Sequence, residues 1–272
     1  MLNRRIFFKH AGAFALGTLF LPACNVGKEK QKESGTAAES ENEKAGQALG
    51  AIGIQIYSVK DILEQDLRGV LQQLADMGYK EIESYPGSQG HYYGMEPKAF
   101  AEMLSELGLT LVSSHFGSGS YTYSADSWHQ ATMLSRFDEL VENAAKTGQK
   151  YLTCSWMDES LRNTPEDLAK TAELFNQVGE KCKQAGMTFA YHNHSFEFDK
   201  VGDHVLYDYM LDNTDPDLVK YEMDIYWLVA AGKDPLAYFE KYPNRFPLGH
   251  VKDMDKQDSQ KNSVIGKGTI DY

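Results

Sequence analysis

The chain has 272 residues, of which 42% are hydrophobic and 24% are charged, so it has enough apolar side chains for a sizeable core, and global disorder is excluded. Its 39 acidic residues outnumber the 27 Lys and Arg residues, and the net charge of −12 argues against nucleic acid as a partner. Three cysteines, Cys24, Cys154 and Cys182, are too few for a disulfide framework.

Residues 1–24 are predicted to be an export signal. Arg4 and Arg5 precede an apolar run at 11–21, which is about half as long as the ~20 residues that span a bilayer. The segment resembles a twin-arginine bacterial lipoprotein signal. This resemblance implies that Cys24 becomes a lipidated N-terminus and that the protein is exported and anchored on the periplasmic side. The alternative is a chance apolar N-terminus with an unmodified Cys24.

Residues 25–48 are predicted to be a solvated linker. Val26 is the only large apolar residue in this range, which consists mostly of Lys, Glu, Ser, Gly, Gln and Ala. Such a composition cannot bury enough apolar surface to fold. We therefore expect one folded domain at 49–272, with no membrane contact other than the lipid at Cys24.

Strand-like and helix-like segments alternate through the folded domain. The helical segments end at glycines, which accommodate the left-handed C-terminal cap of a helix. The β-rich runs are 51–58, 79–84, 109–115, 150–156, 187–194, 218–224 and 246–252, and the main helical segments are 66–77, 97–107, 136–147 and 165–185.

This alternation predicts an α/β fold that is either a doubly wound sheet or a (β/α)8 TIM barrel. The starts of the runs are on average about 32 residues apart, close to the roughly 30 residues per unit of a barrel. No glycine-rich phosphate loop follows the first run, where Tyr57 to Lys60 contain no glycine. The barrel is therefore favoured. One more repeat would begin at about residue 278, so we expect about seven βα units and a barrel that is incomplete at its C-terminus.

Polar side chains gather at the predicted C-terminal ends of the strands, where barrel enzymes carry their active sites. His192 and His194 alternate on one strand and therefore face the same side. Asp224 closes the next run, and His250 lies near the end of the run after that. We predict that His192, Asp224 and His250 share one divalent ion, because imidazole and carboxylate suit Mn²⁺, Co²⁺, Zn²⁺, Mg²⁺ or Fe²⁺. The alternative is that hydrogen bonds in the barrel mouth satisfy each group.

Further candidates lie along the same rim. Glu197 and Lys252 are the catalytic candidates, because they are placed to bind substrate oxygens or move protons, although Glu197 could equally lie on the surface. Aromatic rings could form a wall for the carbon face of a sugar, with core packing as the alternative. For Glu83 and His115, the alternative is a buried residue paired in the core. The predicted substrate-binding residues are Glu83, His115, Trp156, His194 and Trp227.

Four motifs resemble those of the sugar phosphate isomerase/epimerase family, the xylose-isomerase-like TIM barrels. They are YHNHSFEF at 191–198, EMDIYW at 222–227, GHVKD at 249–253 and GKGTIDY at 266–272. The resemblance runs from about Ile52 to the last residue. It implies that His192, Asp224 and His250 are the first three metal ligands and that a Glu on strand eight is the fourth. His192 in place of Glu departs from the pattern of the ketose epimerases.

We therefore expect a divalent-metal-dependent isomerase or epimerase that acts on a free or modified sugar through an enediolate. The metal would chelate a carbonyl and the neighbouring hydroxyl and lower the pKa of the carbon-bound proton between them. The same enolate chemistry can expel a leaving group, so a lyase acting on 3-keto glycosides is an alternative. A non-catalytic sugar-binding lipoprotein is an interpretation from a different class.

Overall fold

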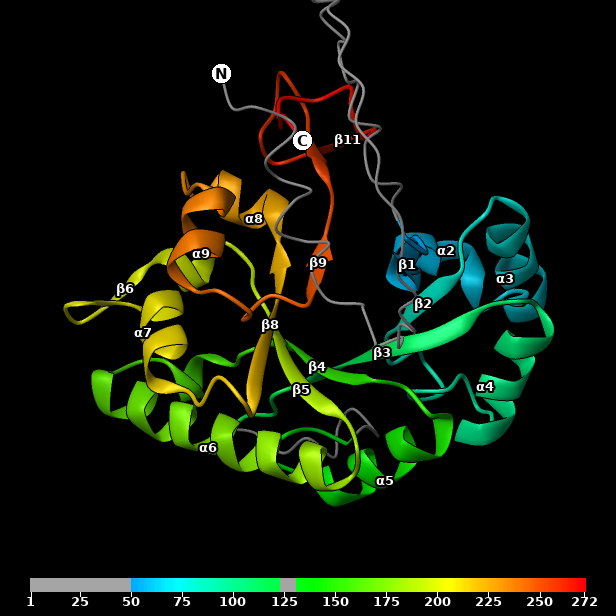
Figure 1. The fold of residues 1–272 in the computed structure, drawn as a ribbon, viewed down its shortest axis with the longest axis horizontal. Coiled ribbons are helices and arrows are strands. Elements are labelled where there is room, and N and C mark those ends of the chain that lie inside the picture. The colour runs from blue at the N-terminus through cyan, green and yellow to red at the C-terminus, as the bar shows by residue number, and fades with distance from the viewer. Residues whose placement is uncertain (1–49, 123–130) are drawn as a thin grey trace, which may run out of the picture.

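The core of the protein is a seven-stranded parallel sheet that curls into a half-barrel (Figure 1). The computed structural model describes residues 50–122 and 131–272. The strands stand in the sheet in their order along the chain, which confirms the seven predicted runs and the barrel-type α/β fold. They are β1 (Gly53–Gln55), β2 (Glu81–Ser84), β3 (Thr110–Gly117), β4 (Tyr151–Trp156), β5 (Thr188–His192), β8 (Val219–Asp224) and β9 (Leu248–His250).

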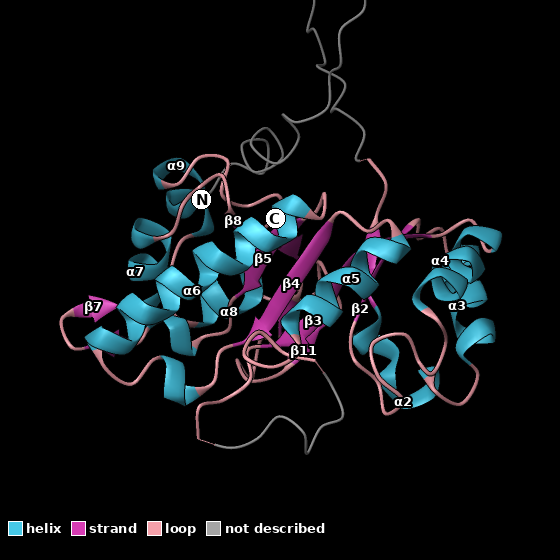
Figure 2. Cartoon of the chain, turned by 90° about the horizontal axis from the view of Figure 1, so that it is seen from below, coloured by secondary structure: helices cyan, strands magenta, loops and turns pink. Residues whose placement is uncertain are grey.

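Helices cover the outer face of this sheet, and Figure 2 shows α5 and α6 lying across β3 and β4. The longer helices are α3 (Leu67–Asp76), α4 (Pro97–Glu106), α5 (Phe137–Thr147), α6 (Pro165–Gln184), α7 (Leu206–Asn213), α8 (Ile225–Ala230) and α9 (Pro235–Lys241). The short elements are η1 (Ile56–Val59), α2 (Lys60–Leu63), η3 (Glu159–Leu161), η4 (Phe196–Phe198) and the paired strands β6 (Lys200–Val201) with β7 (His204–Val205) and β10 (Asp253–Met254) with β11 (Asn262–Ser263).

Local signals account for the ends of the predicted helices. At the start of α6, Thr164 and Asp167 form a capping box, in which each side chain accepts the backbone N–H of the other residue. At the end of α5, Gly148 has a φ of 74°, a left-handed conformation that a glycine adopts without steric cost. The four predicted helical segments are confirmed to within one residue at each end.

The first strand is shorter than the predicted run at 51–58. It ends at Gln55, whose side chain accepts the backbone N–H of Tyr57 and caps the 3-10 helix η1. The cap turns the chain out of the sheet, so Ser58 does not lie on a strand. The helices α7, α8 and α9, which are only six to eight residues long, were not predicted from the sequence.

Two hydrophobic clusters hold the layers together. The larger cluster lies around β3 to β9 and includes Phe175, Phe189 and Tyr221. The smaller cluster lies under α3 and α4 and includes Leu71 and Phe100. Cys154 and Cys182 are buried free thiols, so neither is part of a disulfide.

The segment after β9 is fixed by one buried carboxylate. Asp253 accepts backbone N–H groups from four residues, at 2.8 to 3.1 Å. Gly268 is needed there, because a Cβ atom would lie 2.2 Å from both the Asp253 carboxylate and a backbone oxygen. The Tyr272 hydroxyl donates to the backbone oxygen of Lys252. These bonds hold the backbone that presents the Lys252 side chain. The donors to Asp253 are Met254, Gly266, Gly268 and Ile270.

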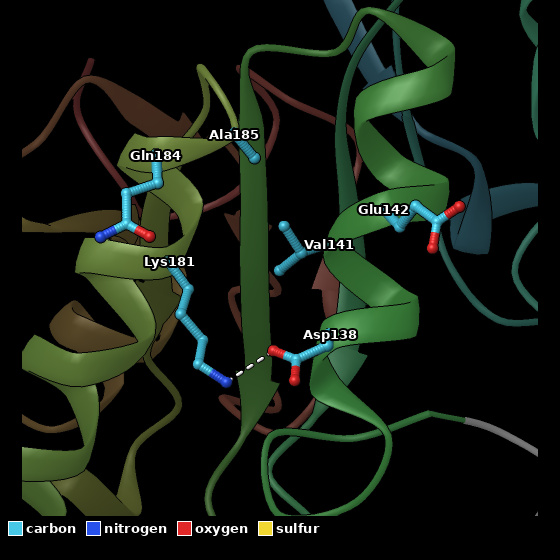
Figure 3. A pocket seen from close by; sticks show the side chains of 6 residues that line it. All are labelled: Asp138, Val141, Glu142, Lys181, Gln184 and Ala185. Atoms are coloured by element: carbon cyan, nitrogen blue, oxygen red, sulfur yellow. Dashed lines mark hydrogen bonds and ion pairs between the residues drawn. The ribbon is translucent and has the colours of Figure 1, made fainter.

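A surface hollow of about 320 Å³ lies between α5 and α6 in the outer helical layer (Figure 3). Across it, Lys181 Nζ lies 2.5 Å from Asp138 Oδ1. None of the polar strand-end residues lines this hollow, so it is separate from the site that they form.

The predicted export signal at 1–24 and linker at 25–48 lie outside the described residues. Within the part of the chain that the structure describes, no helix has the length and apolar character needed to cross a membrane.

Candidate metal centre

Five strand ends bring three histidines and three carboxylates together. The carboxyl ends of parallel strands meet at one edge of a sheet, so side chains far apart in the sequence become neighbours there. All of these side chains are buried except that of His250, which is 14% exposed. They are Glu83 from β2, His115 from β3, His192 from β5, Glu222 and Asp224 from β8, and His250 from β9.

Glu222 and Glu83 form the inner side of this cluster through close contacts with the histidines. Glu222 Oε2 lies 2.9 Å from both His115 Nε2 and His192 Nδ1. Glu83 Oε1 lies 2.9 Å from His115 Nε2 and 2.8 Å from His250 Nε2. These are hydrogen-bond distances between charged or polar groups.

Asp224 forms the outer side of the cluster. Its Oδ2 atom lies 3.6 Å from His192 Nε2 and 3.8 Å from His250 Nδ1. The same oxygen lies 2.5 Å from Lys252 Nζ, while Oδ1 accepts the backbone N–H of Trp227. The rings of His192 and His250 therefore each stand between two carboxylates, with one nitrogen facing inward and the other facing Asp224.

The cluster contains donors suited to a divalent metal. One ligand atom from each of His115, His192, Glu222 and His250 lies within 4.8 Å of the others. Around an ion with bonds of roughly 2.1 Å, tetrahedral ligands are about 3.4 Å apart. The distances from Asp224 to the two imidazoles are close to that spacing, whereas the 2.9 Å contacts of Glu222 are hydrogen bonds. The four-residue group thus has donors that suit a metal, and Asp224, which lies outside that group, has metal-like spacings to two of its imidazoles.

Opposite charges set the protonation of the buried groups. Burial by itself lowers the pKa of His115, but Glu83 and Glu222 outweigh it and raise the pKa to about 9. The same balance raises the pKa of His250 well above its usual value. Burial and the neighbouring His250 and His115 hold the pKa of His192 well below its usual value. Two cationic imidazoles therefore face the buried carboxylates, and the neighbouring His192 is neutral.

Aromatic rings stand beside the Asp224 side of the cluster. Trp156 is 48% exposed, and its ring lies 5.2 Å from that of His194 and 4.9 Å from that of Phe196. The ring of Trp227 lies 5.7 Å from His194. Burial lowers the pKa of His194 to about 4, and among the described residues its Nδ1 atom has no hydrogen-bond partner. The predicted aromatic residues and His194 thus lie together as one wall. The prediction that His194 shares a strand with His192 was wrong, because β5 ends at His192 and His194 lies in the loop that follows.

Glu197 lies behind this wall and is completely buried, so it is not a surface residue. Its carboxylate accepts the Tyr191 hydroxyl at 2.6 Å and the His194 backbone N–H at 2.8 Å. Burial raises its pKa to about 7. Both oxygens are engaged in holding the loop after β5.

Glu222 was not among the predicted site residues, although the sequence contains a signal for it. Glu222 and Asp224 are two residues apart on β8, so they point to the same side of the strand. The predicted site residues lie in the cluster, in the aromatic wall or directly behind it, except Lys252, which pairs with Asp224 at the partly exposed rim.

Comparisons with known proteins agree with the fold. The sequence profile of the family described as xylose isomerase-like TIM barrel matches residues 71–272. Inosose dehydratase from Lacticaseibacillus casei is 26% identical over 217 residues, which cover 70% of this chain and 72% of that protein. The crystal structure of a sugar phosphate isomerase/epimerase from Parabacteroides distasonis ATCC 8503 superposes with a TM-score of 0.67 at 29% identity, covering 85% of this chain and 82% of that one. A structure of the IOLI protein with a bound zinc atom has a similar fold, with a TM-score of 0.58, 14% identity and 80% of each chain covered.

The raised pKa of Glu197 predicts a pH-dependent stability. The pKa of Glu197 is about 7 in the folded state, compared with 4.5 for an ordinary Glu in the unfolded chain. Between these pH values the folded state binds one proton more than the unfolded state. The free energy of unfolding therefore falls as the pH rises from 4.5 to 7. Between pH 5 and 8, the parent should lose on the order of 2 kcal/mol of unfolding free energy relative to Glu197→Gln. Urea denaturation at each pH measures this difference. The exposed Glu142→Gln is the control and should follow the parent; parallel pH profiles for the parent and Glu197→Gln would contradict the prediction.

Proposed function

Because this chain belongs to the xylose isomerase-like TIM-barrel family, we propose that it is a divalent-metal-dependent enzyme acting on a sugar or related polyhydroxylated ketone. The proposed step transfers the proton on the carbon beside the carbonyl to the neutral imidazole of His194 in the aromatic wall, and the C–H electron pair moves to the carbonyl oxygen to form an enolate. Return of the proton to the neighbouring carbon or to the same carbon completes isomerisation or epimerisation. The observation that carries the proposal is the spacing of Asp224 Oδ2 from His192 Nε2 and His250 Nδ1.

We assign the metal to the Asp224 side of the two imidazoles. His192, Asp224 and His250 would hold it, with Glu222 and Glu83 bonded to the far nitrogens of the two rings. A carboxylate on the far nitrogen fixes the orientation of a ligating imidazole and increases its basicity. When bound, a divalent ion supplies Lewis acidity that polarises a substrate carbonyl and stabilises the negative charge that develops on it.

The positions of the other residues of the site suggest their roles. Lys252 carries an ammonium group at the rim that can donate a proton or a hydrogen bond to a substrate oxygen. Trp156 and Trp227 offer apolar surface for the carbon face of the substrate. We propose that Glu197, with both oxygens bonded inside the protein, positions the loop that carries His194 and does not itself reach the substrate.

Glu83 and His115 contact other members of the cluster. We therefore propose that both support the metal ligands and that neither binds the substrate directly. His115 bridges Glu83 and Glu222 through its Nε2 atom, and Gln55 lies 3.2 Å from its Nδ1 atom. This arrangement ties the ends of β1, β2, β3 and β8 together beneath the metal ligands.

Elimination is the second candidate outcome. The relative from Lacticaseibacillus casei is named a dehydratase, and the Lys252 ammonium could protonate a departing hydroxyl or glycosidic oxygen. The name of the Parabacteroides distasonis protein favours the first candidate, isomerisation or epimerisation. Both outcomes share the enolate, so they differ only in the step after proton removal.

Proton exchange with solvent tests the proposed chemistry. The zinc- or manganese-loaded protein, incubated in D2O with a ketohexose, an inosose or a 3-keto glycoside, should incorporate deuterium at the carbon beside the carbonyl. Mass spectrometry and NMR distinguish a deuterated substrate isomer from an unsaturated ketone or a released aglycone. A protein that binds these compounds without any carbon-bound exchange would be a sugar-binding protein, which contradicts the proposal.

Loss of a ligand should weaken metal binding. We expect His250→Ala and Asp224→Asn each to reduce Zn²⁺ affinity at least tenfold, because each variant removes a donor from the same ion. Competition with a chromophoric chelator measures the affinity. His204→Ala removes an exposed histidine from β7 and should bind as the parent does. Unchanged affinity in both site variants would place the metal elsewhere.

We also propose that the protein is exported and lipidated at Cys24, on the basis of the Arg4-Arg5 pair and the apolar run before this cysteine. In a bacterial host, the parent should yield a mature N-terminal peptide that starts at a lipid-modified Cys24, and Cys24→Ala should not. Mass spectrometry of the N-terminal peptide distinguishes the two. A mature parent protein that retains Met1 would contradict this.

A further inference from the structure

The Lys252 ammonium lies where it competes for a metal ligand. Its Nζ atom is 2.5 Å from Asp224 Oδ2, and this is the oxygen that faces His192 Nε2 and His250 Nδ1. Asp224 is completely buried, whereas the Lys252 side chain is 36% exposed. One carboxylate oxygen thus serves both the lysine and the proposed metal position.

A buried carboxylate needs a positive partner, since an isolated ionised group in a protein interior is strongly destabilising. Lys252 is the nearest such partner of Asp224 in the structure, and the imidazole of His250 lies farther away, at 3.8 Å. A divalent ion on Asp224 would supply the positive charge instead and would then stand within a few ångströms of the ammonium. Two cations this close repel each other, and the repulsion is strong in a site with little water.

The lysine can move without disturbing the chain around it. Its backbone oxygen accepts the Tyr272 hydroxyl, and the neighbouring Asp253 is held by four backbone N–H groups. The ammonium, by contrast, stands on a flexible four-carbon stem that is partly open to solvent. The backbone can therefore stay in place while the side chain turns outward.

We propose that Lys252 is an internal counterion of Asp224 that the metal displaces, so that metal uptake releases the ammonium toward the substrate. The inference rests on the proposed function, because it takes Asp224 as a metal ligand. It gives Lys252 two positions: on Asp224 before metal binding, where it stabilises the buried carboxylate, and at the rim afterwards, where it meets substrate oxygens. It also means that Lys252 lowers the affinity of the site for metal.

Replacement of Lys252 by methionine tests the competition. Lys252→Met keeps an unbranched, apolar stem and removes the charge. The metal-free variant should unfold at a lower temperature than the metal-free parent, because Asp224 loses its nearest counterion. The variant should also bind Zn²⁺ at least tenfold more tightly in chelator competition, so added Zn²⁺ should raise its melting temperature by more than it raises that of the parent.

Lys261→Met is the matched control. Lys261 lies in the same C-terminal segment and pairs with Asp258 at 3.1 Å on the surface, so its loss should leave both the metal-free melting temperature and the Zn²⁺ affinity as in the parent. If metal-free Lys252→Met does not fold, the variant can be purified with Zn²⁺, and its rate of zinc release to excess chelator should be at least tenfold slower than that of the parent.

The outcomes separate this inference from the proposed function. If the parent binds Zn²⁺ and Asp224→Asn weakens it, but Lys252→Met binds no more tightly than the parent and releases zinc no more slowly, then Lys252 is a structural ion-pair partner and the displacement is wrong. If the parent binds no Zn²⁺, or Asp224→Asn binds it unchanged, the proposed metal site fails and this inference fails with it.

Discussion

The burial of three carboxylates at one end of a parallel sheet is the constraint on which the rest of the site depends. Glu83, Glu222 and Asp224 are each less than one-tenth exposed, and ionised groups in such a place need partners of opposite charge. The cationic imidazoles of His115 and His250 and the Lys252 ammonium supply them, while the neutral His192 is hydrogen-bonded to Glu222. The imidazoles come from three strands, so the charge balance also ties the strand ends together.

Around this cluster, the protein uses further buried carboxylates to hold loops. Asp253 accepts hydrogen bonds from backbone N–H groups of the segment after β9. Glu197 accepts hydrogen bonds from the Tyr191 hydroxyl and from a backbone N–H of the loop after β5. Loops carry functional side chains more precisely when their backbone polar groups are bonded in this way. Lys252 and His194, which face the proposed substrate position, are the residues held by these two networks.

Both ring nitrogens of His192 and His250 are used, and this determines which side of the cluster is available to a ligand. His192 and His250 each turn one nitrogen toward an inner carboxylate and the other toward Asp224. The inner bonds orient the rings, and the outer nitrogens remain for a ligand. The outer side also has the partly exposed Lys252 and the aromatic wall, so a substrate would approach on the same side as the proposed metal.

Much of the architecture was determined by the sequence alone. The seven strands and the four longest helices follow from the alternation of apolar segments and from glycines such as Gly148, because these signals act between residues close in the chain. The positions of His192, Asp224 and His250 at strand ends follow from the same pattern. The end of β1 at Gln55 was missed because a side-chain cap overrides the β-rich composition there.

Only the tertiary structure decided how the strand-end residues meet. Lys252 pairs with Asp224, and Glu222 lies between His115 and His192. Glu197 is completely enclosed. Each of these arrangements brings together residues from different strands or loops, so the local sequence around one residue does not predict it. Strand alternation shows which side a residue faces, but not which nitrogen of an imidazole meets which oxygen. That choice depends on curvature, register and charge balance across strands that lie far apart in the sequence, and these are properties of the folded sheet.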